Sequence, residues 1–367
     1  MQMGGAERTL FQIMKNLNPK LFELYLAAPQ GPFFEFFRPL CREVFFLTPG
    51  YFPVRFRPLA YLRGFYALAR NFYKVRFLMK EVSFDLVFSN TSVILHGLLA
   101  AKVFKIPHIT MAHEILLPSF FRFFISKMLR VFSARVMVQS NAVAKHLFLD
   151  GVFPNLVKIP AGVSLNGDFQ NGSREDQIFK DIPSERPLIG LVGLVEPTKG
   201  IDRFLKMAVE VLEKIPQALF LVVGKYDSKS FYYRRLLTLR RKLGLDHRLI
   251  FTGPIYRIQE LLRRLDILVV TSINESLSLV SLEASANGIP VVAFDVGGIS
   301  EVVHHGVTGC LIPSGDIQSM ALTVTSLVQN EKLRKQMGLE GKKWVHNRFN
   351  LEDQKGKLEE AFLKILS

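Results

Sequence analysis

Two glutamates stand on either side of a predicted helix start. Residues 271–292 read as the end of a strand, a loop that carries Glu275, and a helix that contains Glu283 and stops at Gly288. The first N–H groups of such a helix lack partners within it, so they can bind an anion such as a diphosphate. We expect one carboxylate to approach a ligand from the loop and the other from the helix. The spacing alone is weak evidence, and a solvated Glu283 is the alternative.

The elements that would position these groups alternate along the chain. Short apolar runs are separated by amphipathic segments of helix length, which indicates βαβ units and parallel sheets. Runs such as 219–223 and 267–270 are apolar on both faces, as expected of strands covered by helices on both sides. The predicted strands are 22–28, 43–47, 85–89, 108–112, 135–139, 156–159, 188–192, 218–223, 249–252, 267–271, 290–294 and 310–312.

The 367 residues suit two α/β domains of the doubly wound, Rossmann-like kind. Residues 166–186 are rich in Asn, Gly, Ser and Asp and predict a linker between domains at 1–165 and 187–349. Residues 350–367 predict a C-terminal helix that can cross back to the first domain. Two such domains facing each other leave a cleft at the carboxyl ends of their strands, where ligands bind. Only three residues precede Gly4, so we expect the first strand of the N-terminal domain to be missing.

The order of motifs in both halves resembles glycosyltransferase family 4, retaining enzymes of the GT-B fold. The resemblance covers nearly the whole chain and is most specific in its C-terminal half. In that half it rests on VGLVEPTKG at 192–200, FTG at 251–253, Glu275, Glu283, GIPVVA at 288–293, the glycines at 297–298, Glu301, GVTG at 306–309 and PSGD at 313–316. In the first half it rests on GGAER at 4–8, SNT at 89–91, His113 with Glu114, and VQSN at 138–141.

The resemblance implies roles for the residues that match the donor motifs. Glu283 would hold the ribose hydroxyls of a nucleotide, because a carboxylate can accept two charge-assisted hydrogen bonds. Glu275 would bind hydroxyls of the donor sugar, assisted by the backbone N–H groups of Ser276 and Leu277. Lys199 would lie against the diphosphate and stabilise the charge that develops on the leaving group. A structural lysine in a Lys-Gly turn is the alternative for Lys199.

Other matched residues would contribute backbone rather than side chains. In this family the base is recognised largely through the backbone, here at Gly253, Pro254 and Ile255. Gly193 opens the phosphate loop. A Cβ at such a glycine would obstruct the ligand.

In the first half, the resemblance places further donor contacts at Gly4, Gly5 and His113. The two glycines would let the backbone approach the phosphates or the acceptor. His113 ends a predicted strand, and the family's histidine at this place contacts the donor sugar. A lone histidine after a strand is also often a structural hydrogen-bonding residue, which is the alternative.

The sequence departs from the family's pattern at two places. Leu194 stands where the family usually has arginine after the phosphate-loop glycine, so Lys199 must carry more of the diphosphate charge unless Arg203 or Lys225 reaches it. The usual Glu-Gly-Phe-Gly is ESLS at 275–278, which has larger side chains at two positions. These departures keep an inactive homologue open as an alternative.

We expect no metal and no cofactor. The Asp-x-Asp motif of metal-dependent glycosyltransferases does not occur, and the nucleotide-diphosphate sugar would be the substrate. Cys41 and Cys310 form no disulfide framework, which favours a reducing compartment. No apolar run reaches the roughly 18–20 residues of a spanning helix, and the first residues do not resemble a signal peptide. We therefore expect a cytoplasmic protein that can lie peripherally on the inner face of the plasma membrane.

The charge of +15 is concentrated in the first half. Residues 1–170 hold 20 Lys and Arg against 9 Asp and Glu, a net charge of +11, and the remainder has +4. Cations alternate with aromatic residues near 51–77 and 120–135, which suits an anionic membrane surface. The alternative is a solvated helix face beside core phenylalanines. Nucleic acid is not an expected partner, because no nucleic-acid-binding motif accompanies the charge.

These features together predict a glycosyltransferase that moves a sugar from a nucleotide sugar to a saccharide or lipid-linked acceptor. The expected process is synthesis of bacterial cell-surface polysaccharide or glycolipid. A nucleotide-sugar 2-epimerase on the same fold is an alternative and would need acid–base residues such as Glu114 and Asp227. A catalytically inactive, membrane-associated homologue is the third reading.

Overall fold

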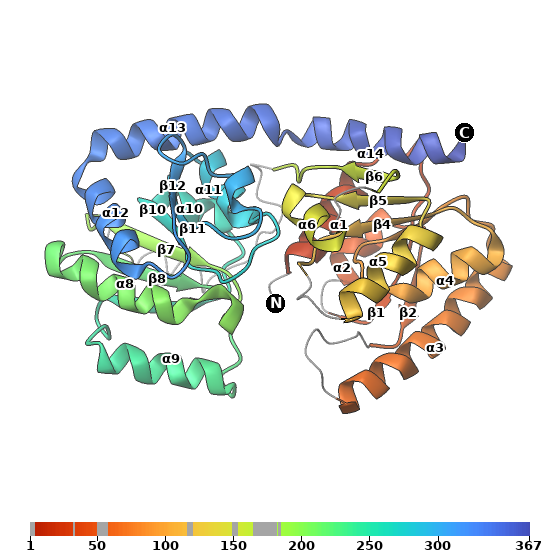
Figure 1. Ribbon diagram of the computed structural model, residues 1–367, viewed down its shortest axis with the longest axis horizontal. Helices are drawn as coiled ribbons and strands as arrows, with labels where there is room; N and C mark the ends of the chain where they lie inside the picture. Colours follow the sequence, from red (N-terminus) through yellow and green to blue (C-terminus); the bar gives the residue numbers. More distant parts are fainter. Residues whose placement is uncertain are drawn as a thin grey trace. The chain divides into compact units, whose positions relative to one another are not determined.

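The computed structural model describes residues 4–31, 34–49, 58–115, 120–148, 153–163, 182 and 185–367, with side chains left out at 58–61 and 120 (Figure 1). Two compact units can be distinguished. The C-terminal unit is Gly162–Leu351, and the N-terminal unit is Met3–Ala161 together with Glu352–Ser367. Most of the predicted linker at 166–186 lies outside the described residues.

The C-terminal unit has a six-stranded parallel sheet in the order β12-β11-β10-β7-β8-β9. The order reverses between β7 and β10, the point at which ligands bind in doubly wound sheets. Its strands are β7 (Leu188–Val192), β8 (Leu219–Val223), β9 (Leu249–Gly253), β10 (Ile267–Val270), β11 (Val291–Phe294) and β12 (Gly309–Ile312). Its helices are η2 (Pro197–Lys199), α8 (Ile201–Lys214), α9 (Phe231–Lys242), α10 (Ile258–Arg264), α11 (Leu279–Ala286), η3 (Ile299–Glu301), α12 (Ile317–Gln329) and α13 (Glu331–Arg348).

The central strands of this sheet are apolar on both faces because helices cover both sides. All five residues of β8 and all four of β10 are buried. One hydrophobic cluster extends from β7 across β8 to β11 and takes in the inner faces of α8 and α12. The continuous run of apolar residues that predicted these strands is thus accounted for by burial on both faces.

The N-terminal unit holds its described strands in two parallel sheets, with orders β1-β2 and β3-β4-β5-β6. The strands are β1 (Tyr25–Pro29), β2 (Glu43–Leu47), β3 (Val87–Ser89), β4 (His108–Ala112), β5 (Arg135–Val138) and β6 (Leu156–Lys158). The helices are α1 (Gly5–Asn16), α2 (Phe34–Phe37), η1 (Arg38–Leu40), α3 (Pro58–Glu81), α4 (Leu95–Phe104), α5 (Phe120–Phe132), α6 (Asn141–Leu147) and α14 (Leu351–Leu366). The expectation of a missing first strand stays a prediction.

The last helix, α14, packs on the N-terminal unit although it ends the chain. Phe362 contacts the rings of Phe22 and Phe88 edge-on, with centroids 5.8 and 5.7 Å apart. The Asn18 backbone N–H donates to Glu359 at 2.8 Å. The boundary between the units therefore falls at 351/352, close to the predicted start of this helix at residue 350.

The fold agrees with the α/β, doubly wound class predicted from the sequence. Several predicted strands coincide with the observed ones, and β1 differs most, beginning at Tyr25 rather than at residue 22. In the part of the chain that is described, no helix is both long and apolar enough to span a membrane.

Candidate functional site

The reversal point of the C-terminal sheet brings Lys199 and Glu275 together. Lys199 follows β7 and Glu275 follows β10, and these strands are neighbours although 76 residues separate the two side chains. Lys199 Nζ lies 2.5 Å from Glu275 Oε1. The two residues that the resemblance assigned to the diphosphate and the sugar thus form one ion pair at the carboxyl edge of the sheet.

Glu275 is held firmly in this position. Its side chain is only 11% exposed, and Oε1 also accepts a hydrogen bond from Ser272 Oγ at 2.8 Å. Its backbone carbonyl accepts from the Gly298 N–H at 2.9 Å, which anchors the loop to the segment after β11. A sugar hydroxyl would therefore meet a carboxylate with a fixed direction, which lowers the ordering cost of binding.

Three glycines line the carboxyl ends of β7, β8 and β9. A Cβ on Gly224 would lie 1.9 Å from the Gly193 carbonyl oxygen, and Gly224 has a φ of +147°. The Gly224 N–H donates to the Gly253 carbonyl at 2.9 Å. The aliphatic stem of Lys199 passes over Gly193, 3.5 Å from where its Cβ would be. The close approach of the Gly193 backbone therefore excludes a side chain at Gly224.

The turn that carries Lys199 is docked on the loop after β10. Thr271 Oγ1 donates to the Lys199 carbonyl at 2.9 Å, and the Ile273 N–H donates to the Thr198 carbonyl at 2.8 Å. Gly200 has a φ of +60°, and a Cβ there would lie 2.2 Å from the Thr271 carbonyl oxygen. Sequence reasoning missed the roles of Gly200, Gly224 and Thr271, although the Lys-Gly turn was a visible signal for the first.

Helix α11 begins after an unusual residue, Ser278. Its φ of +69° is in the left-handed region that favours glycine. Ser278 Oγ lies 2.7 Å from Ser281 Oγ, and both side chains are buried. Leu277 is buried as well, so of the predicted loop residues 275–277 only Glu275 and Ser276 retain partial exposure.

Glu283 is the fifth residue of α11 and is half-buried. Ile255 is buried and Pro254 is half-buried at the end of β9. Gly253 has a φ of +79°. The residues predicted for the base and the ribose thus all belong to the C-terminal unit, whereas Gly4, Gly5 and His113 belong to the N-terminal unit.

Leu194, in the place of the family's arginine, is 37% exposed. Arg203, in the first turn of α8, lies over the Phe294 ring at 5.6 Å. Its Nη1 is buried and has no hydrogen-bond partner among the described residues. Arg203 is thus a second cation close to the turn that carries Lys199, since its Cδ lies 3.4 Å from the Cβ position of Gly200.

His113 belongs to the N-terminal unit, where three neighbouring strands each end in a polar residue. Asn90 follows β3, His113 follows β4 and Gln139 follows β5. His113 Nε2 lies 3.1 Å from Asn90 Oδ1, and Nδ1 lies 3.1 Å from Gln139 Oε1. Asn90 Nδ2 donates to the Ala6 carbonyl at 2.8 Å, and Gln139 Nε2 lies 3.4 Å from Thr9 Oγ1. This cluster ties the start of α1 to the edge of the sheet.

Burial lowers the pKa of His113, and the charge of Glu114 only partly opposes this. The ring is therefore neutral near pH 7 and carries one proton. The bond from Asn90 to Ala6 fixes the Asn90 oxygen toward Nε2, so the proton belongs on Nε2.

Gly4 and Gly5 lie at the N-terminus of α1, with Gly5 as its first residue.

Glu114 accepts from the Ser92 hydroxyl at 2.8 Å and from the Ser92 N–H at 3.2 Å. Asp227 accepts from the Lys229 N–H at 2.9 Å in an exposed turn. Both acid–base candidates of the epimerase reading are thus engaged in local structural contacts.

Among the described residues, no group of three or more His, Cys, Asp or Glu side chains could hold a metal ion. The charged groups at the reversal point are a lysine, a carboxylate and a nearby guanidinium. Together with the helix N-terminus, they suit a ligand that has both an anionic group and hydroxyls.

Known protein families match both halves of the chain. Residues 3–166 match the family model described as Glycosyltransferase Family 4, and residues 173–344 match that described as Glycosyl transferases group 1. A D-inositol 3-phosphate glycosyltransferase of Nocardia farcinica is 33% identical over 171 residues, which are 44% of this chain and 38% of the relative. An N-acetyl-alpha-D-glucosaminyl L-malate synthase of Bacillus anthracis is 31% identical over 45% of each chain. The matched stretch thus spans less than half of either relative.

Solved structures resemble nearly the whole chain. Anabaena HepE in complex with UDP-glucose has a TM-score of 0.83 at 23% identity and covers 99% of this chain and 97% of its own. Sucrose-phosphate synthase from Thermosynechococcus elongatus has a TM-score of 0.79 at 20% identity, with 99% and 94% covered. These likenesses establish the fold.

Proposed function

We propose that this chain, which belongs to glycosyltransferase family 4, is a retaining glycosyltransferase that uses a nucleotide-diphosphate sugar. The observation that carries the proposal is the ion pair of Lys199 and Glu275 at the reversal point of the C-terminal sheet. A cation and a carboxylate side by side at this edge of the sheet suit a donor that carries both a diphosphate and a sugar.

The chemistry of the donor assigns a task to each side chain. When the bond between the anomeric carbon and the diphosphate oxygen breaks, negative charge develops on the leaving diphosphate. Lys199 stabilises that charge in a partly buried setting, where a preorganised cation is most effective. Glu275 orients the sugar hydroxyls and Glu283 holds the ribose. The α11 N-terminus adds partial positive charge for the phosphates.

A uridine diphosphate sugar is the first donor to test. Anabaena HepE has been solved in complex with UDP-glucose, and this chain shares its fold. If the base is recognised through the backbone at 253–255, the side chains there do not identify the nucleotide, so donors with different bases must be compared by measurement. No metal or cofactor is part of the proposal.

For the acceptor we propose a saccharide or a lipid-linked saccharide at the inner face of the plasma membrane, in cell-surface polysaccharide or glycolipid synthesis. The support is the net charge of +11 in residues 1–170 and the aromatic side chains exposed on α3 and α5. Each cation near an anionic surface contributes roughly 1 kcal/mol, so a few of them suffice for reversible attachment.

The test is to measure nucleotide release from UDP-, GDP- and ADP-sugars, with and without a saccharide acceptor, and to analyse the sugar product. A transferase releases nucleotide in step with a new glycoside whose anomeric configuration matches that of the donor. A glycoside of inverted configuration would contradict the retaining mode. An epimerised sugar would establish the 2-epimerase alternative, and binding without release would establish the inactive homologue.

A further inference from the structure

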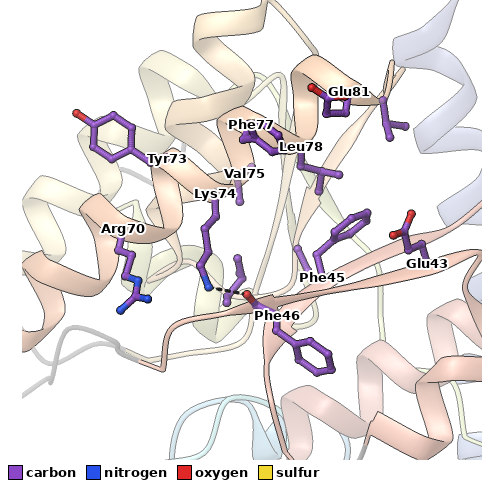
Figure 2. A pocket seen from close by; sticks show the side chains of 13 residues that line it. Glu43, Phe45, Phe46, Arg70, Tyr73, Lys74, Val75, Phe77, Leu78 and Glu81 are labelled. Carbon is purple, nitrogen blue, oxygen red and sulfur yellow. Dashed lines mark hydrogen bonds between the residues drawn. The ribbon is translucent and has the colours of Figure 1, made fainter.

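An apolar groove runs between β2 and α3 in the N-terminal unit (Figure 2). Its volume is about 650 Å³, within the roughly 300–1,000 Å³ of typical ligand pockets. The groove shares no residue with the Lys199–Glu275 pair, which belongs to the C-terminal unit. Its floor is largely hydrocarbon and is formed by Ala27, Phe45, Leu47, Val75, Leu78 and Val82.

Two side chains of α3 hold the strand and the helix together at the carboxyl end of β2. The buried Asn71 accepts from the Thr48 N–H at 2.8 Å and donates to the Thr48 carbonyl at 3.0 Å. Lys74 Nζ donates to the Phe46 carbonyl at 2.9 Å (Figure 2). The groove is therefore bounded by fixed backbone, with β2 on one side and a helix on the other.

The charges of the groove differ between its two ends. Arg70 and Lys74 line it toward the carboxyl end of β2, and Glu43 and Glu81 line it toward the amino end (Figure 2). The Arg70 Nη1 donates to Tyr66 Oη at 3.0 Å, which steadies the guanidinium near the first end. An anion is thus favoured at one end and repelled at the other.

Exposed aromatic rings also lie along α3 at the rim of the groove and beyond it. Tyr66, Tyr73 and Phe77 follow one another at helical spacing and are 60–66% exposed. The helix holds five Lys and Arg and one Glu. Exposed rings interleaved with cations are typical of a helix that lies at the interface of an anionic bilayer.

We propose that this groove binds one hydrocarbon chain of an anionic, phosphate-bearing lipid. The phosphate lies beside Arg70 and Lys74, and the chain runs along β2 toward Glu43. The apolar floor accounts for the chain, and the charge difference between the ends accounts for its direction. This inference rests on the proposed function and deepens it, because it names a site on this chain for the lipid part of a lipid-linked acceptor.

A titration of the full chain with decyl phosphate, kept below its micelle-forming concentration, tests the chain site. Ala27 is exposed on β1 and lines the groove, so Ala27→Trp fills it from the strand side. We expect about tenfold weaker binding, because losing two buried methylene contacts alone corresponds to that factor. The matched control is Ala69→Trp, which adds the same ring to α3 outside the groove. If Ala27→Trp fails to fold, Leu78→Trp fills the same space from the helix.

A second pair of variants tests the direction of the chain. Arg70→Glu should weaken decyl phosphate about tenfold while leaving the uncharged decyl maltoside nearly unchanged. Arg76→Glu, on the same helix but outside the groove, is the matched control. Equal effects of the two reversals would reduce the site to general surface charge and overturn the proposal. Binding of inorganic phosphate as tight as that of decyl phosphate would also overturn it.

The result can be separated from the fate of the proposed function. UDP binding reports the C-terminal unit, so every groove variant should bind UDP like the parent chain. Unchanged decyl phosphate binding by Ala27→Trp would end the lipid inference and leave the transferase untouched. Self-association of the chain that is lost in Ala27→Trp, without any decyl phosphate binding, would assign the groove to a second copy instead.

Discussion

The two units of this protein differ in the size of the hydrophobic clusters that support their surface side chains. In the C-terminal unit, a hydrophobic cluster extends across the sheet and into the inner faces of α8 and α12. The described clusters of the N-terminal unit are smaller, such as that of Leu47, Val75, Met79 and Ala100 among β2, α3 and α4. The continuous core holds the strand ends that bring Lys199 to Glu275. The N-terminal unit, with its smaller clusters, has an open groove and exposed aromatic side chains. The Lys199–Glu275 ion pair thus lies on the unit with the larger hydrophobic core.

Acid should reveal this difference most strongly, because the buried His108 and the half-buried His96 lie in the N-terminal unit. Burial lowers the pKa of His96 to about 4 and that of His108 to about 3. Below pH 6.5 these histidines bind protons in the unfolded chain but stay neutral in the folded protein. Their contribution to the free energy of unfolding is therefore fully present above that pH and is lost as the pH drops. Each histidine should cost about 2 kcal/mol by pH 5.

The test uses Trp344, the one tryptophan of the sequence, which lies in α13 of the C-terminal unit. On acid titration, far-UV ellipticity should fall before the Trp344 fluorescence changes. His96→Leu should move the first transition to lower pH, whereas His247→Leu, exposed on the C-terminal unit, should not. Coincident transitions in all variants would show that the units do not differ in this way.

Removal of the Lys199 amine should have the next largest effect, on turnover rather than on folding. Lys199→Ala should lower the rate about 10²–10³-fold, because the developing diphosphate charge loses its preorganised cation. Lys206→Ala, an exposed lysine of α8, is the control and should turn over normally. Initial rates at saturating donor measure both. Near-normal turnover of Lys199→Ala would transfer the role to Arg203, whose buried Nη1 lacks a hydrogen-bond partner among the described residues.

Glu283→Gln should weaken nucleotide binding with the fold intact. Loss of the charge-assisted bonds to a ribose should cost about 1.5–3 kcal/mol. Glu213→Gln, exposed near the end of α8, is the matched control. Calorimetric titration with UDP measures both variants. An unchanged affinity for Glu283→Gln would place the ribose elsewhere.

The smallest effects are expected where a non-glycine residue has a positive φ. Lys105 in the N-terminal unit has a φ of 58° and ends α4, and its side chain is exposed. Lys105→Gly should therefore raise the free energy of unfolding by about 1 kcal/mol. Ser278→Gly relieves the same strain but loses the hydrogen bond to Ser281, worth about 1 kcal/mol, so its net effect should be near zero. Urea unfolding measures both, and equal gains would mean that the Ser278 bond contributes nothing.

Much of the local structure could be read from the residues. The strands at 43–47, 108–112 and 188–192 were predicted with the observed bounds, because apolar runs between turn residues are a local signal. The start of β1 was predicted three residues early, because apolar residues before Tyr25 pack in the core without joining the strand. Strand ends depend on pairing with a neighbour, which periodicity does not encode.

The candidate site was predicted unevenly for the same reason. Lys199, Glu275 and Glu283 stood out through their motifs, and the structure joins the first two in an ion pair. The contacts of the His113 ring with Asn90 and Gln139 were not predicted. Each residue follows a different strand, and only the strand order makes them neighbours.

The sequence by itself determined the class of the fold, the family and the residues that could take part in binding or catalysis, because periodicity and motif order are properties of short segments. Only the tertiary structure decided which of those residues meet. The neighbouring positions of β7 and β10 pair Lys199 with Glu275, and the packing of α3 along β2 opens the groove. These contacts join residues far apart in the chain. They exist only after the buried apolar surface has outweighed the entropy of ordering the segments between them.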